Sequence, residues 1–368
     1  MATETRKPLS VGIVGCGRMG RHHASVLSSM PEFCLIAAVD PDSEARRKMQ
    51  EQFACEGFES IWGMLQFSRP DIVVIATHVP YHHQQTLDAI RSGCHVVCEK
   101  PMACTLAECD DMVDMAHASQ KVLAIHHQYR FSRALLEMKS IIRYSRIGDL
   151  CLIRCVGKGR RADSDLMEIA GHLLHVALFV EGTLPTSVFG DVTENGQLVR
   201  YEDARKIKYR YPEGRDSGVG AGNRMFGYYQ FPSGVRAELT LYQVDEAPNT
   251  YGENRAMGFY VELLGTKGRL QFYPSCRLFW NKSALDDIGY DSTPWEEVNP
   301  ALRVETDPVL TKRFYDDLLS AIENKRPPLV DGRIGRDVME MSLGLVTSHL
   351  AGGPITLPCE KRTHPFLR

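Results

Sequence analysis

The sequence predicts an α/β protein in which a doubly wound parallel sheet precedes an α+β region with an open, mainly antiparallel sheet. Two features of the chain carry this prediction. Up to residue 128, short apolar runs alternate with amphipathic, helix-like stretches. From about residue 130 onward, longer strand-like segments follow, and some of them contain hairpin turn signals.

In the first 128 residues, the expected strands are continuous β-branched runs, which are typical of parallel strands buried on both faces. They span residues 9–15, 34–40, 71–77, 95–100 and 122–128. Helical patterns separate them, at residues 20–29, 43–53, 81–92 and 105–119. A doubly wound sheet of this Rossmann type binds ligands at the carboxyl ends of its strands.

The second part of the chain combines helices with long strands. Helices are expected at residues 131–145, 165–180 and 309–350, a strand at 149–159, and hairpins within 225–244 and 258–274. The polar, glycine-rich segment 193–222 is expected to be a loop. The expected domains are therefore residues 1–128 and 129–368, with the last helices able to pack back on the first domain.

Composition narrows the function classes. The net charge of −3 argues against a nucleic-acid-binding surface, and no apolar run is long enough to cross a membrane. The 11 cysteines lack the paired spacing of a zinc site, and the short polar amino terminus lacks the pattern of a signal peptide. We therefore expect reduced thiols in a cytoplasmic protein. The long open sheet predicts self-association, as a homodimer or homotetramer.

The turn GCGRMG lies between the first expected strand and the first expected helix. These residues match the GxGxxG fingerprint of dinucleotide-binding proteins. In that fingerprint Gly15 makes the tight turn, Gly17 lets the backbone approach a pyrophosphate, and Gly20 allows close packing of the helix. Arg18 and Met19 lie between these glycines and are further candidates for cofactor binding, next to the amino end of the helix, which attracts an anion. The alternative is a glycine-rich turn that binds nothing.

Asp40 ends the second expected strand, twenty residues after the last glycine of the turn. A carboxylate there accepts hydrogen bonds from the adenosine ribose and repels a 2′-phosphate, which favours NAD over NADP. Arg46 and Arg47 follow shortly afterwards and leave NADP open, because a guanidinium group can accommodate that phosphate.

The segment DIVVIATHVPYHHQQTLDAIRSGCHVVCEKPMA, residues 71–103, resembles the Gfo/Idh/MocA family of glucose–fructose oxidoreductases, inositol dehydrogenases and rhizopine catabolism proteins. The shared features are a strand ending in Ala-Thr, a histidine five residues later, and the sequence Glu-Lys-Pro. The similarity continues through residues 129–150, 321–343 and 355–358, so it extends over nearly the whole chain.

The resemblance implies an NAD(P)-dependent oxidoreductase that acts on CH–OH groups of a sugar, cyclitol or related polyol. Lys100 corresponds to the family's active-site lysine, and the bond before Pro101 to its usual cis peptide. Thr77, His82 and Glu99 fall at positions that the resemblance assigns to the cofactor site.

Lys100 also has a chemical argument of its own. Hydride leaves a carbinol carbon only as the hydroxyl proton is removed, so a base must lie within hydrogen-bond reach. The alternative is a lysine that pairs with Glu99 or with another acid at a domain boundary.

A second candidate segment matches the family pattern Asp-x-Gly-x-His-x-x-Asp with two changes. Alignment on His172 places Glu168 and His175 at the two carboxylate positions, and the three share one helix face. We interpret His172 as an acid/base group or a ligand of the substrate hydroxyl. Glu168 would orient the substrate or Lys100, and His175 would contact the substrate. The alternatives are a buried structural histidine and a metal site, although the HExxH pattern is absent.

Three further residues are candidates for substrate binding. Gln128 and Tyr129 lie at a strand end where the family often places substrate-facing groups, and interdomain packing is the alternative. Arg160 belongs to a small basic cluster that either binds an anionic substituent or forms a solvated face.

The sequence also contains two adjacent histidine pairs, His22-His23 and His126-His127. Neighbouring side chains on a helix or strand diverge, so we do not expect either pair to act as a unit.

The sequence therefore predicts hydride transfer between NAD, or NADP, and a secondary alcohol or ketone, with Lys100 and His172 sharing proton transfer. Two alternatives keep the fold. One is NAD-using, redox-assisted glycoside cleavage, and the other is a non-catalytic regulator that binds a dinucleotide. The presence of Lys100 and His172 argues against the regulator.

Overall fold

The computed structural model describes residues 7–159, 166–208, 216–243, 258–282, 294–299 and 305–367. The chain divides into two compact units. Unit 1 comprises Met1–Ala103, Glu108–His126 and Asp307–Arg336, and unit 2 comprises Cys104–Ala107, His127–Thr306 and Asp337–Arg368. The domain boundary after residue 128 remains a prediction.

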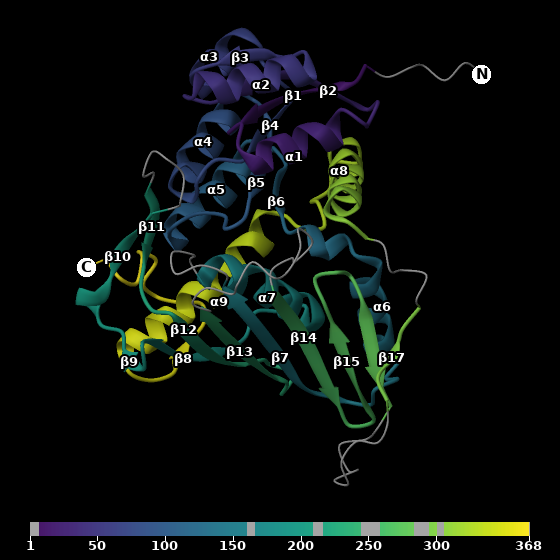
Figure 1. Cartoon of the computed structure of the whole chain (residues 1–368), viewed down its shortest axis with the longest axis vertical. Helices are drawn as coiled ribbons and strands as arrows, with labels where there is room; N and C mark the ends of the chain where they lie inside the picture. Colours follow the sequence, from purple (N-terminus) through teal and green to yellow (C-terminus); the bar gives the residue numbers. More distant parts are fainter. Residues whose placement is uncertain are drawn as a thin grey trace. The chain divides into compact units, whose positions relative to one another are not determined.

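Unit 1 is built on a parallel sheet (Figure 1), whose six strands within the described residues lie in the order β3-β2-β1-β4-β5-β6. The strands are β1 (Leu9–Val14), β2 (Phe33–Val39), β3 (Glu56–Phe58), β4 (Ile72–Ile75), β5 (His95–Glu99) and β6 (Leu123–His126). The strand order reverses direction between β1 and β4, and doubly wound sheets bind ligands at the carboxyl ends of such strands. The predicted Rossmann-type sheet is confirmed.

Helices of unit 1 follow the strands. They are α1 (Arg18–Leu27), α2 (Ser43–Phe53), α3 (Ile61–Phe67), α4 (Val79–Arg91), α5 (Leu106–Ala118, mostly in this unit) and α8 (Asp307–Glu323). The sequence analysis missed β3 and α3, because three and seven residues are too few for a clear periodic pattern. Helix α8 comes from the carboxyl-terminal part of the chain and packs against α1.

Unit 2 contains a mixed, mainly antiparallel sheet, as predicted. In the described part of the chain it has ten strands, in the order β17-β16-β15-β14-β7-β13-β12-β8-β18, with β9 paired to β8. Only the β13–β7 pair among these is parallel. The strands are β7 (Leu150–Gly159), β8 (Ser187–Glu194), β9 (Gln197–Leu198), β12 (Arg224–Gln230), β13 (Arg236–Gln243), β14 (Gly258–Gly265), β15 (Gly268–Phe272), β16 (Leu278–Asn281), β17 (Glu296–Glu297) and β18 (Ile355–Thr356).

The predicted hairpins are present as β12–β13 and β14–β15. The expectation of a loop over residues 193–222 was wrong in part. Besides β9, this segment contains the short helix η2 (Tyr201–Asp203) and a separate antiparallel pair, β10 (Arg205–Lys208) with β11 (Asp216–Gly220). Its polar, glycine-rich composition hid these strands, because two-stranded ribbons need few buried apolar residues.

Helices cover one face of the large sheet (Figure 1): α7 (Leu166–Glu181) and α9 (Gly332–Ala351), while α6 (Arg133–Arg143) packs on β15 and β16. Strand glycines let the helices approach closely. A Cβ on Gly157 would lie 2.8 Å from Ile169 of α7, and one on Gly190 would lie 2.0 Å from the carbonyl oxygen of Leu345 in α9. The core of unit 2 therefore lies between this sheet face and these helices.

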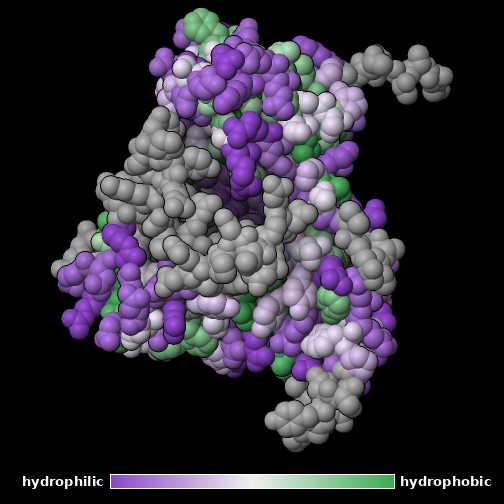
Figure 2. Space-filling model, viewed as in Figure 1, coloured by the Kyte–Doolittle hydropathy of each residue, from purple (hydrophilic) through white to green (hydrophobic). Residues whose placement is uncertain are grey.

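The surface of unit 1 around α2 is predominantly hydrophilic (Figure 2), in agreement with the exposed charges of that helix. Arg47 of α2 pairs with both Glu44 and Glu51, and Lys48 also pairs with Glu44. Within the described ranges, the chain contains no helix that is both long and apolar enough to cross a membrane.

Candidate active site

The glycine-rich turn from β1 into α1 depends on two glycines for its shape. Gly15 has a φ of +98°, and a Cβ there would lie 2.6 Å from the carbonyl oxygen of Ala76. A Cβ on Gly20 would lie 1.8 Å from the carbonyl oxygen of Gly15. Both positions require glycine, because the turn is tight and the helix packs directly on it.

Gly17 differs, because a Cβ there would meet no atom within 4 Å. Gly17 is the N-cap of α1, no side chain caps the helix, and its first turn has no acidic residue. Gly17 and Arg18 are exposed and Met19 is half-buried. Open space beside an uncapped helix N-terminus fits a pyrophosphate, which accepts hydrogen bonds from the N–H groups and is attracted by the helix dipole.

Asp40 follows β2 and lies beside this turn. Its Oδ2 accepts a hydrogen bond from the Cys16 N–H at 2.8 Å, and its Oδ1 accepts one from the Asp42 N–H at 3.0 Å. Arg46 donates to the carbonyl oxygens of Asp40 and Pro41. The carboxylate is therefore fixed next to the turn, where a Rossmann fold holds the adenosine ribose.

Lys100 lies just beyond the carboxyl end of β5 and is half-buried. Its ammonium group makes no hydrogen bond or ion pair with the residues that the structure describes. The bond from Lys100 to Pro101 is cis, as the family resemblance implies. The lysine is thus anchored through its backbone, while its amine is available to a ligand.

His82 of α4 connects two segments at this edge of the sheet. Its Nδ1 lies 3.0 Å from the carbonyl oxygen of Pro101, and its Nε2 lies 3.1 Å from that of Thr77. The Thr77 hydroxyl donates to Oε1 of Gln85 at 2.7 Å. Burial lowers the pKa of His82. A neutral ring carries a single N–H, so it can donate to only one of these two carbonyl oxygens at a time. Contact of Thr77 and His82 with a cofactor stays a prediction.

The sequence analysis missed a buried cluster around Glu99. His23 Nε2 and His126 Nδ1 lie 3.0 and 2.9 Å from the same carboxylate oxygen, Oε1. One histidine comes from each of the two adjacent pairs. His23 lies on the buried face of α1 together with Gly20 and Leu27, and a polar residue on such a face was the available signal.

Helix α8 completes this cluster. The Tyr315 hydroxyl lies 2.7 Å from His23 Nδ1, and the Thr311 hydroxyl lies 3.1 Å from His126 Nε2. His22 Nε2 also lies 2.8 Å from the Thr311 hydroxyl. The sequence offered no signal that residues so far along the chain would join the first sheet.

In unit 2, helix α7 includes Glu168, His172 and His175, and the side chain of Glu168 lies outside the described part. The His172 ring is buried and stacks on Phe259, with ring centroids 6.0 Å apart and an interplanar angle of 15°. Tyr129 meets His172 edge-on at 5.2 Å. An aromatic wall therefore fixes the plane of His172.

Gln128 and Tyr129 lie in the short helix η1 (Gln128–Phe131), and both are buried. His175 is buried too and stacks on His127, with ring centroids 4.6 Å apart and an angle of 5°. Burial, assisted by the positive charge of Arg130, lowers the pKa of His175 to about 3. His175 is therefore uncharged near neutral pH. Arg160 lies outside the described residues.

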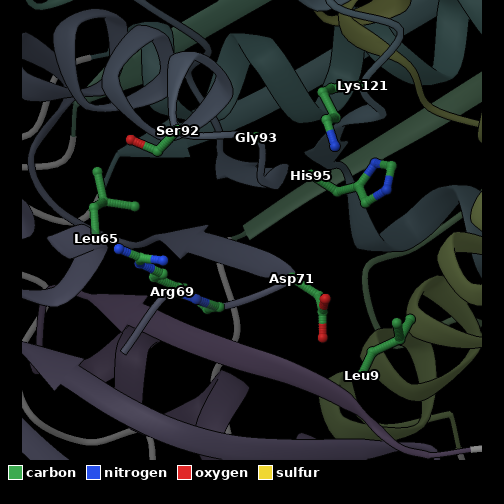
Figure 3. Close-up of a pocket in the computed structure, with 9 residues that line it drawn as sticks. Leu9, Leu65, Arg69, Asp71, Ser92, Gly93, His95 and Lys121 are labelled. Carbon is green, nitrogen blue, oxygen red and sulfur yellow. The ribbon is translucent and has the colours of Figure 1, made fainter. Parts of the chain in front are cut away.

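A hollow of about 420 Å³ lies at the opposite, amino edge of the unit 1 sheet (Figure 3). His95 at the start of β5 and Lys121 before β6 line it, together with Asp71, which precedes β4. It is open, and it lies away from the carboxyl ends at which doubly wound sheets bind ligands. We therefore do not include it in the candidate site.

Comparison with known proteins agrees with this geometry. Residues 9–127 match the family described as "Oxidoreductase family, NAD-binding Rossmann fold" (GFO_IDH_MocA). The Rossmann part of the chain, residues 9–127, belongs to the Gfo/Idh/MocA family. The matched range includes the glycine turn, Asp40 and Lys100.

Curated relatives of this family are sugar and cyclitol dehydrogenases. The chain is 29% identical over 197 residues to D-glucoside 3-dehydrogenase of Escherichia coli, covering 48% of this chain and 55% of the relative. It is 29% identical over 316 residues to D-apiose dehydrogenase of Paraburkholderia graminis, covering 82% and 79%. It is 31% identical over 147 residues to rhizopine catabolism protein MocA of Rhizobium meliloti, covering 39% and 45%. In several of these matches the chain spans only about half the length of the relative.

Solved structures of the same fold include levoglucosan dehydrogenase in complex with NADH and L-sorbose. Its TM-score is 0.77 at 18% identity, covering 96% of this chain and 100% of that one. The WlbA dehydrogenase of Bordetella pertussis, in complex with NADH and UDP-GlcNAcA, gives 0.71 at 19% identity, with coverage of 96% and 100%. At these identities the likeness establishes the Gfo/Idh/MocA fold.

Proposed function

We propose that this protein transfers a hydride between NAD and a secondary alcohol or ketone carbon of a sugar, cyclitol or related polyol. The observation that carries the proposal is the placement of Lys100 at the same carboxyl edge of the unit 1 sheet as the uncapped glycine turn. Dehydrogenases named for D-glucosides, D-apiose and myo-inositol among the relatives support the substrate class.

The cofactor site follows from this edge. Gly15, Gly17 and Gly20 shape the turn that would hold the pyrophosphate, with Arg18 and Met19 in the first helical turn. Asp40 would accept hydrogen bonds from the ribose and disfavour a 2′-phosphate, which gives a preference for NAD. When bound, the nicotinamide supplies or accepts the hydride, and the protein supplies orientation and proton transfer.

Proton transfer requires a side chain that can accept a proton and release it again. Lys100 would take the hydroxyl proton of the alcohol at its Nζ, since no described side chain occupies that amine. His172 would bind the substrate hydroxyl or exchange its proton, because imidazole titrates near neutrality. Glu168 would orient the substrate or Lys100, and Gln128, Tyr129, Arg160 and His175 would shape specificity.

A substrate screen tests the reaction class. Sugars, cyclitols, sugar acids and glycosides are supplied with NAD or NADP, and nicotinamide absorbance is followed. We expect NADH to accumulate with at least one polyol. Release of an aglycone without net NADH would favour redox-assisted glycoside cleavage instead. Tight NAD binding with no turnover on the whole panel would favour a non-catalytic regulator.

Lys100→Met tests the residue assignment on the substrate so found. We expect kcat to fall at least about 100-fold, with NAD affinity changed by less than about tenfold. Lys121→Met is the matched control, because Lys121 is also half-buried in unit 1 but lies at the amino edge of the sheet. Full turnover by Lys100→Met would exclude Lys100 as the base.

We also propose that the outer face of the unit 2 sheet joins two copies of the chain. The strand register places Phe189, Phe226, Tyr228 and Tyr242 on this face, and all four are exposed. Exposed aromatic clusters mark association surfaces. Light scattering should give a dimer or tetramer, and Tyr228→Glu should give a monomer. Trp62→Glu, at an exposed aromatic residue of α3, should leave the assembly intact.

We propose a cytoplasmic location. All 11 cysteines are free thiols, as expected of a protein that is kept in a reducing compartment. Fractionation of cells that express the protein from its own gene tests this, and recovery outside the cytoplasm would exclude it.

A further inference from the structure

Glu99 is a buried carboxylate at the end of β5. It is 5% exposed, and among the described residues no lysine or arginine forms an ion pair with it. Burying a carboxylate costs free energy unless hydrogen bonds or an opposite charge compensate it. The cost of burying the Glu99 carboxylate must therefore be offset by groups that surround it.

Histidine rings supply the hydrogen bonds. His23 and His126 both reach Oε1 of Glu99, and the hydroxyls of Tyr315 and Thr311 lie behind them at the second ring nitrogens. With both rings neutral, each hydroxyl can donate to a ring nitrogen and each ring can donate to the carboxylate. The set is then complete without any added proton.

The electrostatics agree with an ionised carboxylate at Glu99. Burial by itself raises the pKa of Glu99, but interactions with His126 and His23 hold that pKa well below its usual range. Burial lowers the pKa of His23. The cluster therefore stabilises the negative charge of Glu99.

Position gives this charge a function. Glu99 is the last residue of β5, and Oε2 accepts a hydrogen bond from the N–H of Lys100 at 3.2 Å. The dinucleotide crosses the carboxyl edge of such a sheet, and Asp40 beside β2 marks the adenosine half. The nicotinamide half then belongs on the β4 and β5 side. The nicotinamide ring is positively charged in NAD⁺ and uncharged in NADH.

We propose that His23 and His126 hold Glu99 as a fixed anion that makes the protein bind NAD⁺ more tightly, relative to NADH, than the same site would without that charge. This inference rests on the proposed cofactor function. It assigns to the buried cluster a role in cofactor redox-state preference, separate from the proton transfer assigned to Lys100.

The experiment measures dissociation constants of NAD⁺ and NADH by calorimetry for the wild type and for Glu99→Gln. Gln keeps the size and one acceptor oxygen but removes the charge. We expect the NAD⁺ constant to rise about tenfold and the NADH constant to change less than about twofold, as for the loss of one charge interaction at moderate distance. Tyr315→Phe is the control, because it removes a hydroxyl without removing a charge, and should leave the ratio within about twofold.

Lys100→Met supplies an independent arm, because the residue is half-buried and the change is not at the cluster. In the absence of an alcohol, where Lys100 can still hold a proton as an ammonium group, its removal should shift the ratio a few-fold in the opposite direction, toward NAD⁺. This arm tests the charge argument even where Glu99→Gln does not fold.

Several outcomes would overturn the inference. One is an unchanged ratio in Glu99→Gln, and another is equal weakening of both cofactors, which indicates a purely structural cluster. One atom each of His23, Glu99 and His126 could bind a metal ion, since these atoms lie within 4.8 Å of one another. One equivalent of metal retained by the wild type and lost in Glu99→Gln would therefore also overturn the inference. A wild type that binds neither cofactor would instead refute the proposed function itself.

Discussion

The two units bury histidines in contrasting ways. In unit 1, His23 and His126 are held by a carboxylate and by hydroxyl groups. In unit 2, His172 and His175 are stacked on other rings, Phe259 and His127 respectively. The first arrangement uses imidazole as a hydrogen-bond donor to a charge, and the second holds each imidazole flat against another ring.

The contrast teaches that burial alone does not define a histidine's role. Desolvation lowers the pKa of both His23 and His175. Glu99 opposes that shift at His23, whereas Arg130 adds to it at His175. A neighbouring negative charge therefore raises the pKa of a buried imidazole, and a neighbouring positive charge lowers it further.

The largest effect on turnover is expected at His172. If this ring served only for packing, its replacement would leave turnover almost unchanged. His172→Asn should reduce kcat about 1,000-fold, because a proton-transfer or hydroxyl-binding group is lost. Single-turnover kinetics on the identified substrate measure this. Circular dichroism and NAD affinity should match the wild type, and a turnover within about threefold of wild type would assign His172 to packing alone.

His126→Leu tests the unit 1 side of the contrast. The buried carboxylate loses a donor, so we expect the free energy of unfolding to fall by about 3 kcal/mol at pH 7. Urea unfolding followed by fluorescence measures it. His117→Leu, at an exposed residue of α5, is the matched control and should change it by less than about 0.5 kcal/mol. Equal effects at the two sites would show that Glu99 does not depend on His126.

His175→Leu tests the burial of the uncharged His175 ring in unit 2 through the pH dependence of stability. The folded-state pKa of about 3 lies below the unfolded value near 6.5, so below about pH 6.5 the unfolded chain binds a proton that the folded chain does not. Stability is therefore lost as the pH falls. Between pH 7 and pH 5, the wild type should lose about 2 kcal/mol more than the variant. Parallel losses in both proteins would contradict the shift.

Sequence patterns predicted those features that depend on neighbouring residues. The turn glycines and Asp40 belong to short segments whose spacing predicted their place in the fold, and the family resemblance implied the cis bond before Pro101. The order of apolar runs likewise predicted the parallel sheet of unit 1 and the hairpins of unit 2.

Features that depend on distant segments were not predictable in this way. Tyr315 and Thr311 meet His23 and His126 through the packing of α8, which no local spacing encodes. The strands β10 and β11 were hidden by polar composition. The sequence identified His172 and His175 as candidate site residues. Their stacking on Phe259 and His127 could not be predicted, because it depends on how η1, α7 and β14 pack together.

The origin of α8 has a consequence for how the protein comes into being. Residues Asp307–Arg336 belong to unit 1, although the whole of His127–Thr306 is synthesised before them. While the chain leaves the ribosome, His23 and His126 therefore lack the hydroxyl groups of Tyr315 and Thr311 until those residues have been made. A fragment ending at residue 126 would remain in that unfinished state, so unit 1 matures only after most of unit 2 has been made.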